Sequence, residues 1–280
     1  MNAEERAFSI AGPQGDMLGI VSLPPPGTPV QRTAVVVVVG GAQYRVGSHR
    51  QFVLLARHLA TAGYPVLRFD LPGMGDSPGE FTPFEATPPH IGAAIDALQT
   101  ACPGANQVVL WGLCDGASAS LLYVQATADP RVAGLALLNP WVRSEVSLAK
   151  TRVKHYYRQR LLSADFWQKL LRGGVGWPAL RSLFGNLARM GGAQAQPQAF
   201  QHRMAEGWHR FTGPVLLLLS ERDLTAQEFA EYADAQPAWA GWRQKAGVAQ
   251  QRVAEADHTC SSASAREAVE QGTLRWLRSV

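Results

Sequence analysis

Short apolar runs rich in valine recur along the chain, and they restrict its fold more than any other feature. The segments between them carry apolar residues at three- to four-residue spacing, which is typical of helices packed on one side. Strands that are apolar throughout indicate a sheet buried on both faces, and such sheets are mostly parallel. The alternation predicts an α/β fold with a mostly parallel central sheet and helices on both faces. The predicted strands span residues 33–39, 65–70, 107–112, 132–138, 214–220 and 248–255.

Turn and cap residues predict how these elements begin and end. Residues 7–10 and 17–23 flank the turn-forming run Gly-Pro-Gln-Gly, so we expect an antiparallel hairpin before the sheet. Ser48 is expected to cap the first helix and Gly63 to end it. Further helices are predicted over residues 91–98, 115–128, 226–235 and 265–278.

Composition limits the class of protein. Among 280 residues, 46% are hydrophobic and 17% are charged, which favours a globular chain with a sizeable core. The three cysteines, Cys102, Cys114 and Cys260, are too few and too scattered for a disulfide framework or a zinc site. The charged N-terminus does not resemble a signal peptide, and the longest apolar run is too short to span a membrane. We expect a cytoplasmic protein in a reducing compartment, with no cofactor.

One connection is far longer than a single helix requires. Residues 141–210 separate two predicted strands and are interpreted as an inserted basic helical lid, with the α/β core formed by 1–140 and 211–280. The insertion carries twelve Lys and Arg against three Asp and Glu, a net charge of +9, and the rest of the chain has −5. This basic charge favours an anionic partner, and a solvated helix surface explains it equally well.

The insertion supplies candidate substrate contacts. An anionic partner, such as a coenzyme A or phosphopantetheine thioester, an acidic carrier protein or an acidic saccharide, would meet Arg152, Lys154 and Arg158. Tyr156 and Trp167 would line an acyl pocket, although packing of the lid onto the core explains the aromatic residues as well. Nucleic acid is disfavoured because no segment resembles a known reader motif. The sequence predicts no oligomeric state.

The most informative motif is Gly-Leu-Cys-Asp-Gly at residues 112–116. A buried strand leads into it and a helix of small residues follows, which is the context of a nucleophile elbow. Cys114 would then lie at a helix N-terminus, where the partial positive charge favours a thiolate. Taken alone, the motif is better explained by a buried structural cysteine.

A candidate acid and a candidate base follow Cys114 in the chain, in that order. Asp223 comes directly after the strand at 214–220, and His258 comes after the last strand. Nucleophile, acid and histidine is the chain order of α/β-hydrolases, and each group lies past the end of a strand, where open α/β sheets place their sites. The chain therefore resembles an α/β-hydrolase in which Cys114 replaces the nucleophilic serine. The resemblance implies a Cys114–His258–Asp223 catalytic triad.

Two further segments carry the resemblance. Residues 39–43 stand where the family has its His-Gly oxyanion loop, with Gly40 in place of the histidine. The resemblance implies oxyanion donors from the backbone N–H of Ala42 or Gln43 and of Asp115. Residues 70–77 resemble the family turn D-x-x-G-x-G-x-S. A dinucleotide fingerprint is a weak competitor there because no helix follows the glycines.

A narrower resemblance is carried by residues 44–50, 112–115, 138–143 and 154–157. These segments are similar to the bacterial hydrolases encoded alongside the exosortase A and exopolysaccharide system, the exosortase A system-associated hydrolase 1 group. The resemblance implies hydrolase chemistry in exopolysaccharide-linked metabolism and leaves the substrate open.

These residues predict acyl transfer through a covalent intermediate. His258 would pair with the Cys114 thiol, Asp223 would orient the imidazole, and the thiolate would attack an acyl ester or thioester. An acyltransferase that uses the same acyl-enzyme, and a non-catalytic binding protein on the hydrolase fold, are the alternatives. Asp115 is interpreted as a favourable anion in a helix's first turn, with binding of an amine or hydroxyl acceptor as the alternative. Cys260 is expected to be a spare buried thiol, with a redox switch as its alternative.

Overall fold

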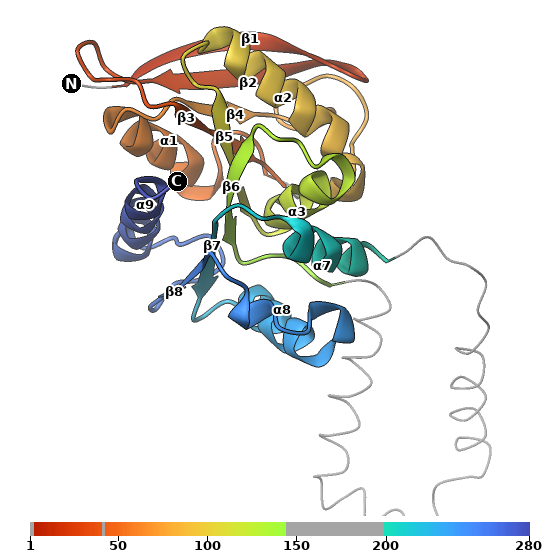
Figure 1. The fold of residues 1–280 in the computed structure, drawn as a ribbon. Helices are drawn as coiled ribbons and strands as arrows, with labels where there is room; N and C mark the ends of the chain where they lie inside the picture. Colours follow the sequence, from red (N-terminus) through yellow and green to blue (C-terminus); the bar gives the residue numbers. More distant parts are fainter. Residues whose placement is uncertain (1–2, 41–42, 144–198) are drawn as a thin grey trace, which may run out of the picture. The chain divides into compact units, whose positions relative to one another are not determined.

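A computed structural model describes residues 3–40, 43–143 and 199–280 of the chain. Within them a single sheet runs in the order β1-β2-β4-β3-β5-β6-β7-β8 (Figure 1). The first two strands form an antiparallel hairpin, β2 pairs antiparallel with β4, and all later pairings are parallel. The strands are β1 (Glu4–Gly12), β2 (Gly15–Leu23), β3 (Thr33–Val38), β4 (Val66–Phe69), β5 (Gln107–Leu113), β6 (Val132–Leu138), β7 (Val215–Ser220) and β8 (Val248–Val253).

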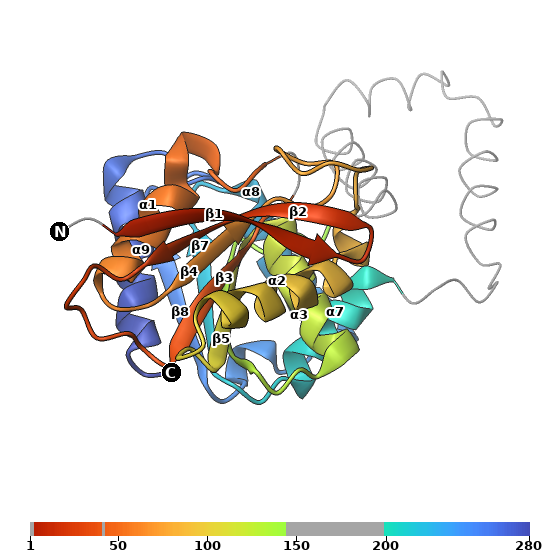
Figure 2. The same ribbon diagram turned by 90° about the horizontal axis from the view of Figure 1, so that it is seen from above.

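Helices cover both faces of this sheet (Figures 1 and 2). On one face lie α1 (Gln51–Thr61) and α9 (Ala263–Leu277), and on the other lie α2 (Pro88–Ala101), α3 (Asp115–Thr127) and α7 (Phe200–Arg210). The helix α8 (Leu224–Ala235) follows β7. Short 3-10 turns span Ser48–Arg50, Phe84–Ala86, Pro237–Trp239 and Trp242–Gln244. The predicted α/β fold, with a mostly parallel sheet between helices, is confirmed.

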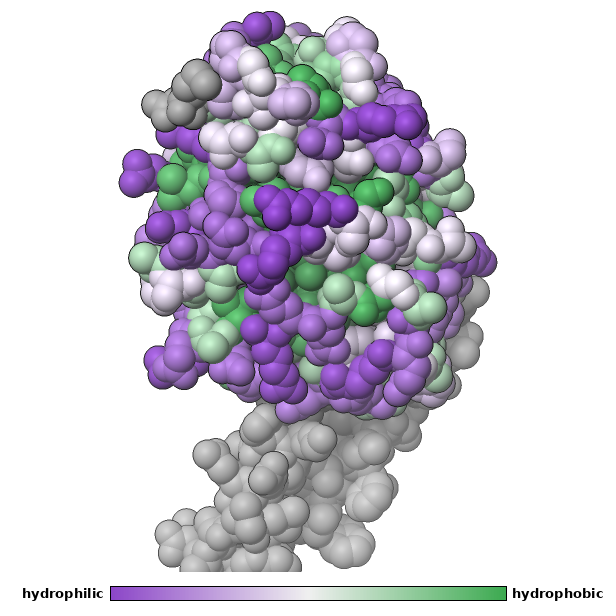
Figure 3. Space-filling model, turned by 60° about the vertical axis from the view of Figure 1, so that its left-hand side comes forward, coloured by the Kyte–Doolittle hydropathy of each residue, from purple (hydrophilic) through white to green (hydrophobic). Residues whose placement is uncertain are grey.

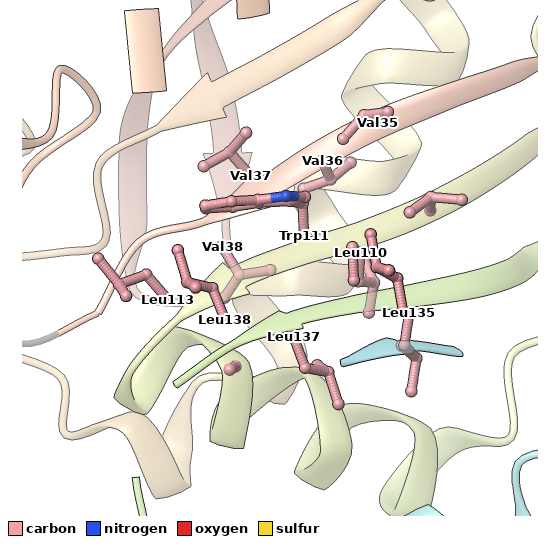
Figure 4. Close-up of a cluster of buried hydrophobic side chains, with 14 of the residues drawn as sticks. Val35, Val36, Val37, Val38, Leu110, Trp111, Leu113, Leu135, Leu137 and Leu138 are labelled. Atoms are coloured by element: carbon pink, nitrogen blue, oxygen red, sulfur yellow. The ribbon is translucent and has the colours of Figure 1, made fainter. Parts of the chain in front are cut away.

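The core lies on the two faces of the central strands (Figure 4). The side chains of Val35–Val38 are all 0% exposed, because β3 lies inside the sheet between β4 and β5 and helices cover both faces of that sheet. Trp111 of β5 lies edge-on to Phe52 of α1, with ring centroids 5.8 Å apart, and its indole N–H donates to the Thr273 hydroxyl of α9. Each such large side chain contributes about 1.5–3 kcal/mol by leaving water, so the central strands provide a rigid base for the loops at their ends.

The predicted start of the first helix is wrong. Ser48 makes no capping hydrogen bond through its side chain, and α1 begins at Gln51. The chain reverses just before the helix, with His49 at φ 53° and Arg50 at φ 62°, both in the left-handed region. Two successive residues other than glycine in that region are unusual, and propensity alone does not reveal them.

The end of the predicted insertion packs with the core. The helix α7 lies against α3 so closely that a Cβ on Gly207 would come within 2.3 Å of the Leu121 carbonyl oxygen. The Gln201 side-chain amide also donates to the Val142 carbonyl at 3.1 Å. Residues 200–210 therefore belong to the compact unit formed by Met1–Val142 and Phe200–Val280, although the sequence placed them in the lid. The rest of the predicted lid falls almost entirely on 144–198, outside the described residues, and so do Arg152, Lys154, Tyr156, Arg158 and Trp167.

The surface mixes hydrophilic and hydrophobic residues, as the face drawn in Figure 3 illustrates. Among the described residues the large hydrophobic side chains that are exposed are Val30, Tyr44, Phe81 and Leu224. Three of these follow the carboxyl ends of the parallel strands β3, β4 and β7. No helix in the described ranges combines the length and the apolar character needed to cross a membrane.

Candidate active site

Cys114 occupies a strained turn between β5 and α3. Its backbone has φ 60° and ψ −123°, a combination that residues other than glycine rarely adopt. A conformation of this kind costs on the order of 1–3 kcal/mol and persists only where the surrounding structure enforces it. The predicted elbow therefore has the strained strand-turn-helix geometry that presents a nucleophile at the carboxyl edge of a sheet.

The glycines on either side of Cys114 make this turn sterically possible. A Cβ on Gly112 would come within 2.4 Å of the Gly116 carbonyl carbon, so the strand and the helix could not approach. A Cβ on Gly116 would come within 2.2 Å of the Val38 carbonyl oxygen at the end of β3. Both contacts involve backbone atoms that cannot move aside, so the motif needs glycine at both positions.

Backbone hydrogen bonds tie the elbow to the segment after β6. The Cys114 N–H donates to the Leu138 carbonyl at 2.9 Å, and the Cys114 carbonyl accepts from the Trp141 N–H at 3.2 Å. The Ser118 hydroxyl accepts from the Trp141 N–H and donates to the Trp141 carbonyl. The peptide groups of Cys114 are therefore held by the end of β6 and the residues after it, as well as by α3.

Asp223 and His258 form a hydrogen-bonded pair at the ends of β7 and β8. One Asp223 oxygen, Oδ1, accepts from the Thr225 N–H at 3.0 Å and caps α8, and Oδ2 lies 2.8 Å from His258 Nδ1. Asp223 is buried, and the His258 side chain is about one-third exposed, at 34%. A carboxylate at Nδ1 favours the tautomer with the proton on Nδ1, which leaves Nε2 as the proton acceptor.

The electrostatic surroundings favour a protonated His258. The hydrogen bond that His258 donates to Asp223 raises the pKa of His258, burial opposes the shift, and the charges of Asp223, Asp115 and Asp257 add to it in that order. Asp257 is itself fixed as an anion because hydrogen bonds from Ser261 lower the pKa of its carboxyl. A raised histidine pKa stabilises an imidazolium, the partner that a cysteine thiolate needs.

Asp115 lies against Gly40, in the loop that follows β3. A Cβ on Gly40 would come within 2.0 Å of Asp115 Oδ1 and 2.4 Å of the Gly116 N atom. The carboxylate therefore fills the space that a side chain at residue 40 would occupy. This contact accounts for glycine at the position where the family resemblance expects histidine.

The predicted oxyanion donors differ in their surroundings. The Gln43 N–H donates to the Gly40 carbonyl at 3.3 Å. Ala42 lies outside the described residues. Asp115 is the first residue of α3 and directly follows Cys114, whose carbonyl accepts from the Ala117 N–H at 3.1 Å.

Beyond Gln43 an ionic network holds the same loop. The Arg45 N–H donates to Asp70 Oδ1 at 2.6 Å, and the Arg45 guanidinium binds both Asp70 and Asp76. The Arg68 guanidinium donates to the Arg45 carbonyl at 3.0 Å and to Glu5 at 2.6 Å. Asp70 and Arg68 are almost completely buried, at 0% and 1% exposure. We call Arg45, Asp70 and Arg68 the ionic clamp.

The sequence did not assign the clamp. Arg45, Arg68 and Asp70 belong to segments that carry the family resemblance, but only the fold brings loop 44–50 and the turn after β4 together. Gly75 is the sequence feature that could have indicated the buried Asp70 carboxylate, because a Cβ at this position would lie 2.2 Å from Asp70 Oδ2. The D-x-x-G-x-G-x-S pattern therefore reserves room for a buried carboxylate.

Cys260 is a buried thiol beside Ser220, with Sγ 3.8 Å from the Ser220 hydroxyl oxygen. Burial raises its pKa to about 11, so it stays protonated at neutral pH and reacts slowly. These surroundings favour the interpretation of Cys260 as a spare thiol over a redox switch. In the described part of the chain, no group of three or more His, Cys, Asp or Glu side chains is arranged to hold a metal ion.

Comparisons with known proteins place the chain in a family. The model of the alpha/beta hydrolase family matches residues 35–271, which include β3, the elbow, Asp223 and His258. The chain belongs to the alpha/beta hydrolase family and is an enzyme, a hydrolase. No curated protein matches the sequence.

Solved structures share this fold at low sequence identity. An α/β serine hydrolase without a lid from Xanthomonas campestris is 17% identical, with a TM-score of 0.57, and the match covers 98% of this chain and 95% of that one. An esterase from Pyrococcus furiosus is 15% identical, with a TM-score of 0.64 and coverage of 99% and 93%. Est1E from Butyrivibrio proteoclasticus, solved with ferulic acid bound, is 14% identical, with a TM-score of 0.63 and coverage of 97% and 100%.

Proposed function

We propose that this hydrolase cleaves acyl esters or thioesters through a covalent acyl-enzyme on Cys114, with His258 as base and Asp223 as its orienting acid. The strained backbone of Cys114 at the elbow is the observation that carries the proposal. A structural cysteine gains nothing from a conformation that costs on the order of 1–3 kcal/mol. A nucleophile does gain, because the turn exposes its sulfur at the end of the sheet.

The reaction follows from the chemistry of the three groups. The Cys114 thiolate attacks the acyl carbonyl carbon and forms a carbon–sulfur bond, while the bond to the leaving alkoxide or thiolate breaks. The His258 imidazolium gives its proton to that leaving group. Neutral His258 then takes a proton from water, the hydroxide oxygen bonds to the acyl carbon, and the Cys114 thiolate departs. Backbone N–H groups at Asp115 and in loop 40–43 stabilise the oxyanion in both halves.

Two of the structural neighbours are consistent with ester chemistry. The Pyrococcus furiosus protein is described as an esterase, and the Butyrivibrio proteoclasticus protein binds ferulic acid, a carboxylic acid. A sulfur nucleophile makes thioesters equally suitable, because the acyl-enzyme is itself a thioester and the exchange is nearly balanced in energy. We therefore extend the substrate class from esters to thioesters.

The same acyl-enzyme would serve an acyltransferase, and Asp115 is the observation that favours this second candidate. Its carboxylate lies against the loop at Gly40, and its charge acts on His258. An amine acceptor that arrives as an ammonium ion would be attracted there and would lose its proton to the base. Hydrolysis remains the leading proposal because water needs no binding group.

The residues predicted in the insertion define the donor side of the proposal. The net charge of +9 over residues 141–210 favours anionic acyl donors, including carrier-bound ones. Charge reversal at Arg152, Lys154 and Arg158 should raise KM for anionic donors and leave neutral esters unaffected. An exopolysaccharide-linked acyl group, as the exosortase resemblance implies, would be one such donor.

Intact-mass spectrometry tests the proposal. Wild-type protein and Cys114→Ala are exposed briefly to acyl-coenzyme A thioesters and activated esters, and Cys260→Ala serves as the matched control. We expect an acyl adduct in the wild type and in Cys260→Ala and none in Cys114→Ala. Decay of the adduct in water, compared with added amines, separates hydrolysis from transfer. An adduct that survives in Cys114→Ala would refute the proposed nucleophile.

A further inference from the structure

The last residue of β6 and the residue that follows it bind the proposed nucleophile and the proposed base. The Leu138 carbonyl accepts from the Cys114 N–H at 2.9 Å. The next residue, Asn139, donates from Nδ2 to the His258 carbonyl at 3.2 Å. Cys114 and His258 are far apart in the chain, so this segment forms a short, direct link between the two.

The Asn139 side chain is fully engaged. Its Oδ1 accepts from the Ser220 N–H at 2.8 Å, and its Nδ2 donates to the Ser220 hydroxyl at 3.0 Å as well as to His258. An amide has two N–H donors, and both are used here. The side chain is 0% exposed, so water cannot replace these partners. We call Asn139 and Ser220 the neutral latch.

The backbone of Asn139 also departs from the ordinary. It has φ 49°, in the left-handed region, and its N–H donates to the Leu218 carbonyl at 3.0 Å. Asparagine enters this region at lower cost than other residues with a Cβ, second only to glycine. The left-handed turn directs the Asn139 side chain across the end of β7 toward the His258 loop. A residue that continued the strand would point its side chain to one face of the sheet instead.

We propose that Asn139 is a positioning residue that sets the place of His258 relative to Cys114. This inference rests on the proposed function. Asp223 fixes the rotation of the imidazole by holding Nδ1, and Asn139 fixes the position of the His258 peptide group. Both are needed because a displacement of about 1 Å between catalytic groups can cost about 100-fold in rate.

The latch acts through geometry alone. Among the residues that the structure describes, Asp223, Asp115 and Asp257 are the charged groups that raise the pKa of His258. Asn139 and Ser220 carry no charge, so their removal changes the field at the ring only by moving it. A shift in the titration of the Cys114–His258 pair on removing the latch would therefore report displacement.

Alkylation of Cys114 by iodoacetamide across pH provides the test, because it needs no substrate. Peptide mass spectrometry follows Cys114, and the buried thiols Cys102 and Cys260 serve as slow internal references. In the wild type we expect thiolate reactivity to begin below the ordinary thiol pKa of about 8.5. In Asn139→Gly the reactivity at pH 7 should fall about 10-fold, with its rise moved to higher pH.

The choice of variants separates the side chain from the backbone. Asn139→Gly keeps the left-handed backbone accessible and removes the amide, whereas Asn139→Ala also adds backbone strain. The two should share the same pH shift, and Asn139→Ala should melt at a lower temperature. Ser220→Ala removes the hydroxyl that fixes Nδ2 and should give a smaller shift in the same direction; it decides the question if Asn139→Gly does not fold.

The outcomes distinguish this inference from the proposed function. A folded Asn139→Gly, or a folded Ser220→Ala in its place, with the wild-type pH profile overturns the positioning role and leaves the proposed nucleophile standing. A wild type whose Cys114 reacts only at the pH of an ordinary thiol overturns the activated Cys114–His258 pair, and the positioning role with it. A shift to higher pH in the variants supports both.

Discussion

Two loops of the candidate site are held in opposite ways. The His258 loop is held by the neutral latch of Asn139 and Ser220, both almost completely buried. The loop that follows β3 is held by the ionic clamp, in which Arg45 binds buried Asp70 and accepts a hydrogen bond from Arg68. The first support contains no charge, and the second consists of ions.

The difference follows from what each loop carries. At 4 Å and an effective dielectric constant of 20, a unit charge interacts with another by about 4 kcal/mol, equivalent to about 3 pKa units. An ionic support beside His258 would therefore move its pKa far from neutral, whereas an amide holds the loop without that effect. The loop after β3 presents backbone N–H groups, which do not titrate, so ions can hold it. The cost is that buried ions must keep all their partners.

The largest expected effect comes from removing the carboxylate that orients the base. Asp223→Asn should lower kcat by on the order of 10⁴-fold, because the amide cannot hold the Nδ1–H tautomer. A matched Asp257→Asn should lower kcat far less, since its carboxylate is hydrogen-bonded to Ser261. Steady-state kinetics on the ester or thioester identified by acyl trapping provides the measurement. Comparable losses in the two variants would mean that total charge, and not orientation, governs His258.

The same variant has a pH-dependent stability. The folded pKa of His258 is raised, so its pairing with Asp223 stabilises the fold fully below the unfolded value of about 6.5 and loses this effect as pH rises through the folded value. The loss of Tm in Asp223→Asn should therefore be greater at pH 5.5 than at pH 8.5. Calorimetry at the two pH values checks the sign. Equal losses at both would show that the ion pair adds nothing beyond the α8 cap.

The ionic clamp should be the most sensitive support in terms of stability. Asp70→Asn leaves the Arg45 guanidinium without its buried countercharge, and we expect a loss of about 3–5 kcal/mol in the free energy of unfolding. Asp76 binds the same guanidinium, but its side chain is 65% exposed, so Asp76→Asn should cost less than about 1 kcal/mol. Urea unfolding compares them. Similar losses would contradict the view that burial makes the clamp strong.

The end of the loop after β3 at Gly40 lies against Asp115 and Gly116 at the start of α3, and no room is left there for a side chain at residue 40. Gly40→Ala would place a Cβ 2.0 Å from Asp115 Oδ1 and 2.4 Å from the Gly116 N atom. The side chain can rotate away and the backbone cannot, so we expect a loss of about 1–3 kcal/mol from overpacking. Gly104→Ala is the control, because a Cβ there meets nothing within 4 Å. A Gly40→Ala protein as stable as Gly104→Ala would show that the loop yields easily.

The sequence predicts well those features whose cause is local. The strand at 132–138 coincides with β6, and the others match within a few residues, because a strand buried on both faces is apolar throughout. The elbow at Cys114 could also be predicted from its two glycines. A side chain at either position would collide with the backbone of the motif itself or with the end of β3. Chain order then identified Asp223 and His258, which the fold brings to a hydrogen bond.

What the sequence missed depends on distant contacts. Asn139 reads as an ordinary loop residue until β7 and the His258 loop are placed beside it. The Arg45–Asp70 pair joins two loops, and neither pattern shows that both partners are buried. Ser48 has the right chemistry for a cap, but the left-handed turn at His49 and Arg50 carries it out of position. Such features arise from tertiary packing, which local propensity does not encode.

The smallest expected effect concerns the carboxylate of Asp115, which follows the proposed nucleophile Cys114 in the chain. The charge of Asp115 raises the pKa of His258 less than the hydrogen bond that His258 makes to Asp223. It raises that pKa more than the charge of Asp257 does. Asp115→Asn keeps the side-chain shape against Gly40 and should lower the pKa of His258 by less than Asp223→Asn and by more than Asp257→Asn. NMR titration of the His258 ring protons measures all three without a substrate.

The order of these shifts is the informative quantity. If the carboxylate of Asp115 faces the ring, His258 loses its proton at lower pH in Asp115→Asn and the deacylating base becomes available earlier. If instead Asp115 serves only the N-terminus of α3, the titration stays where it is and only helix stability changes, by a few tenths to 1 kcal/mol. A separate loss of amine acceptors in Asp115→Asn, with acylation of Cys114 intact, would make this carboxylate an acceptor-binding group, and the balance between hydrolysis and transfer would then depend on it.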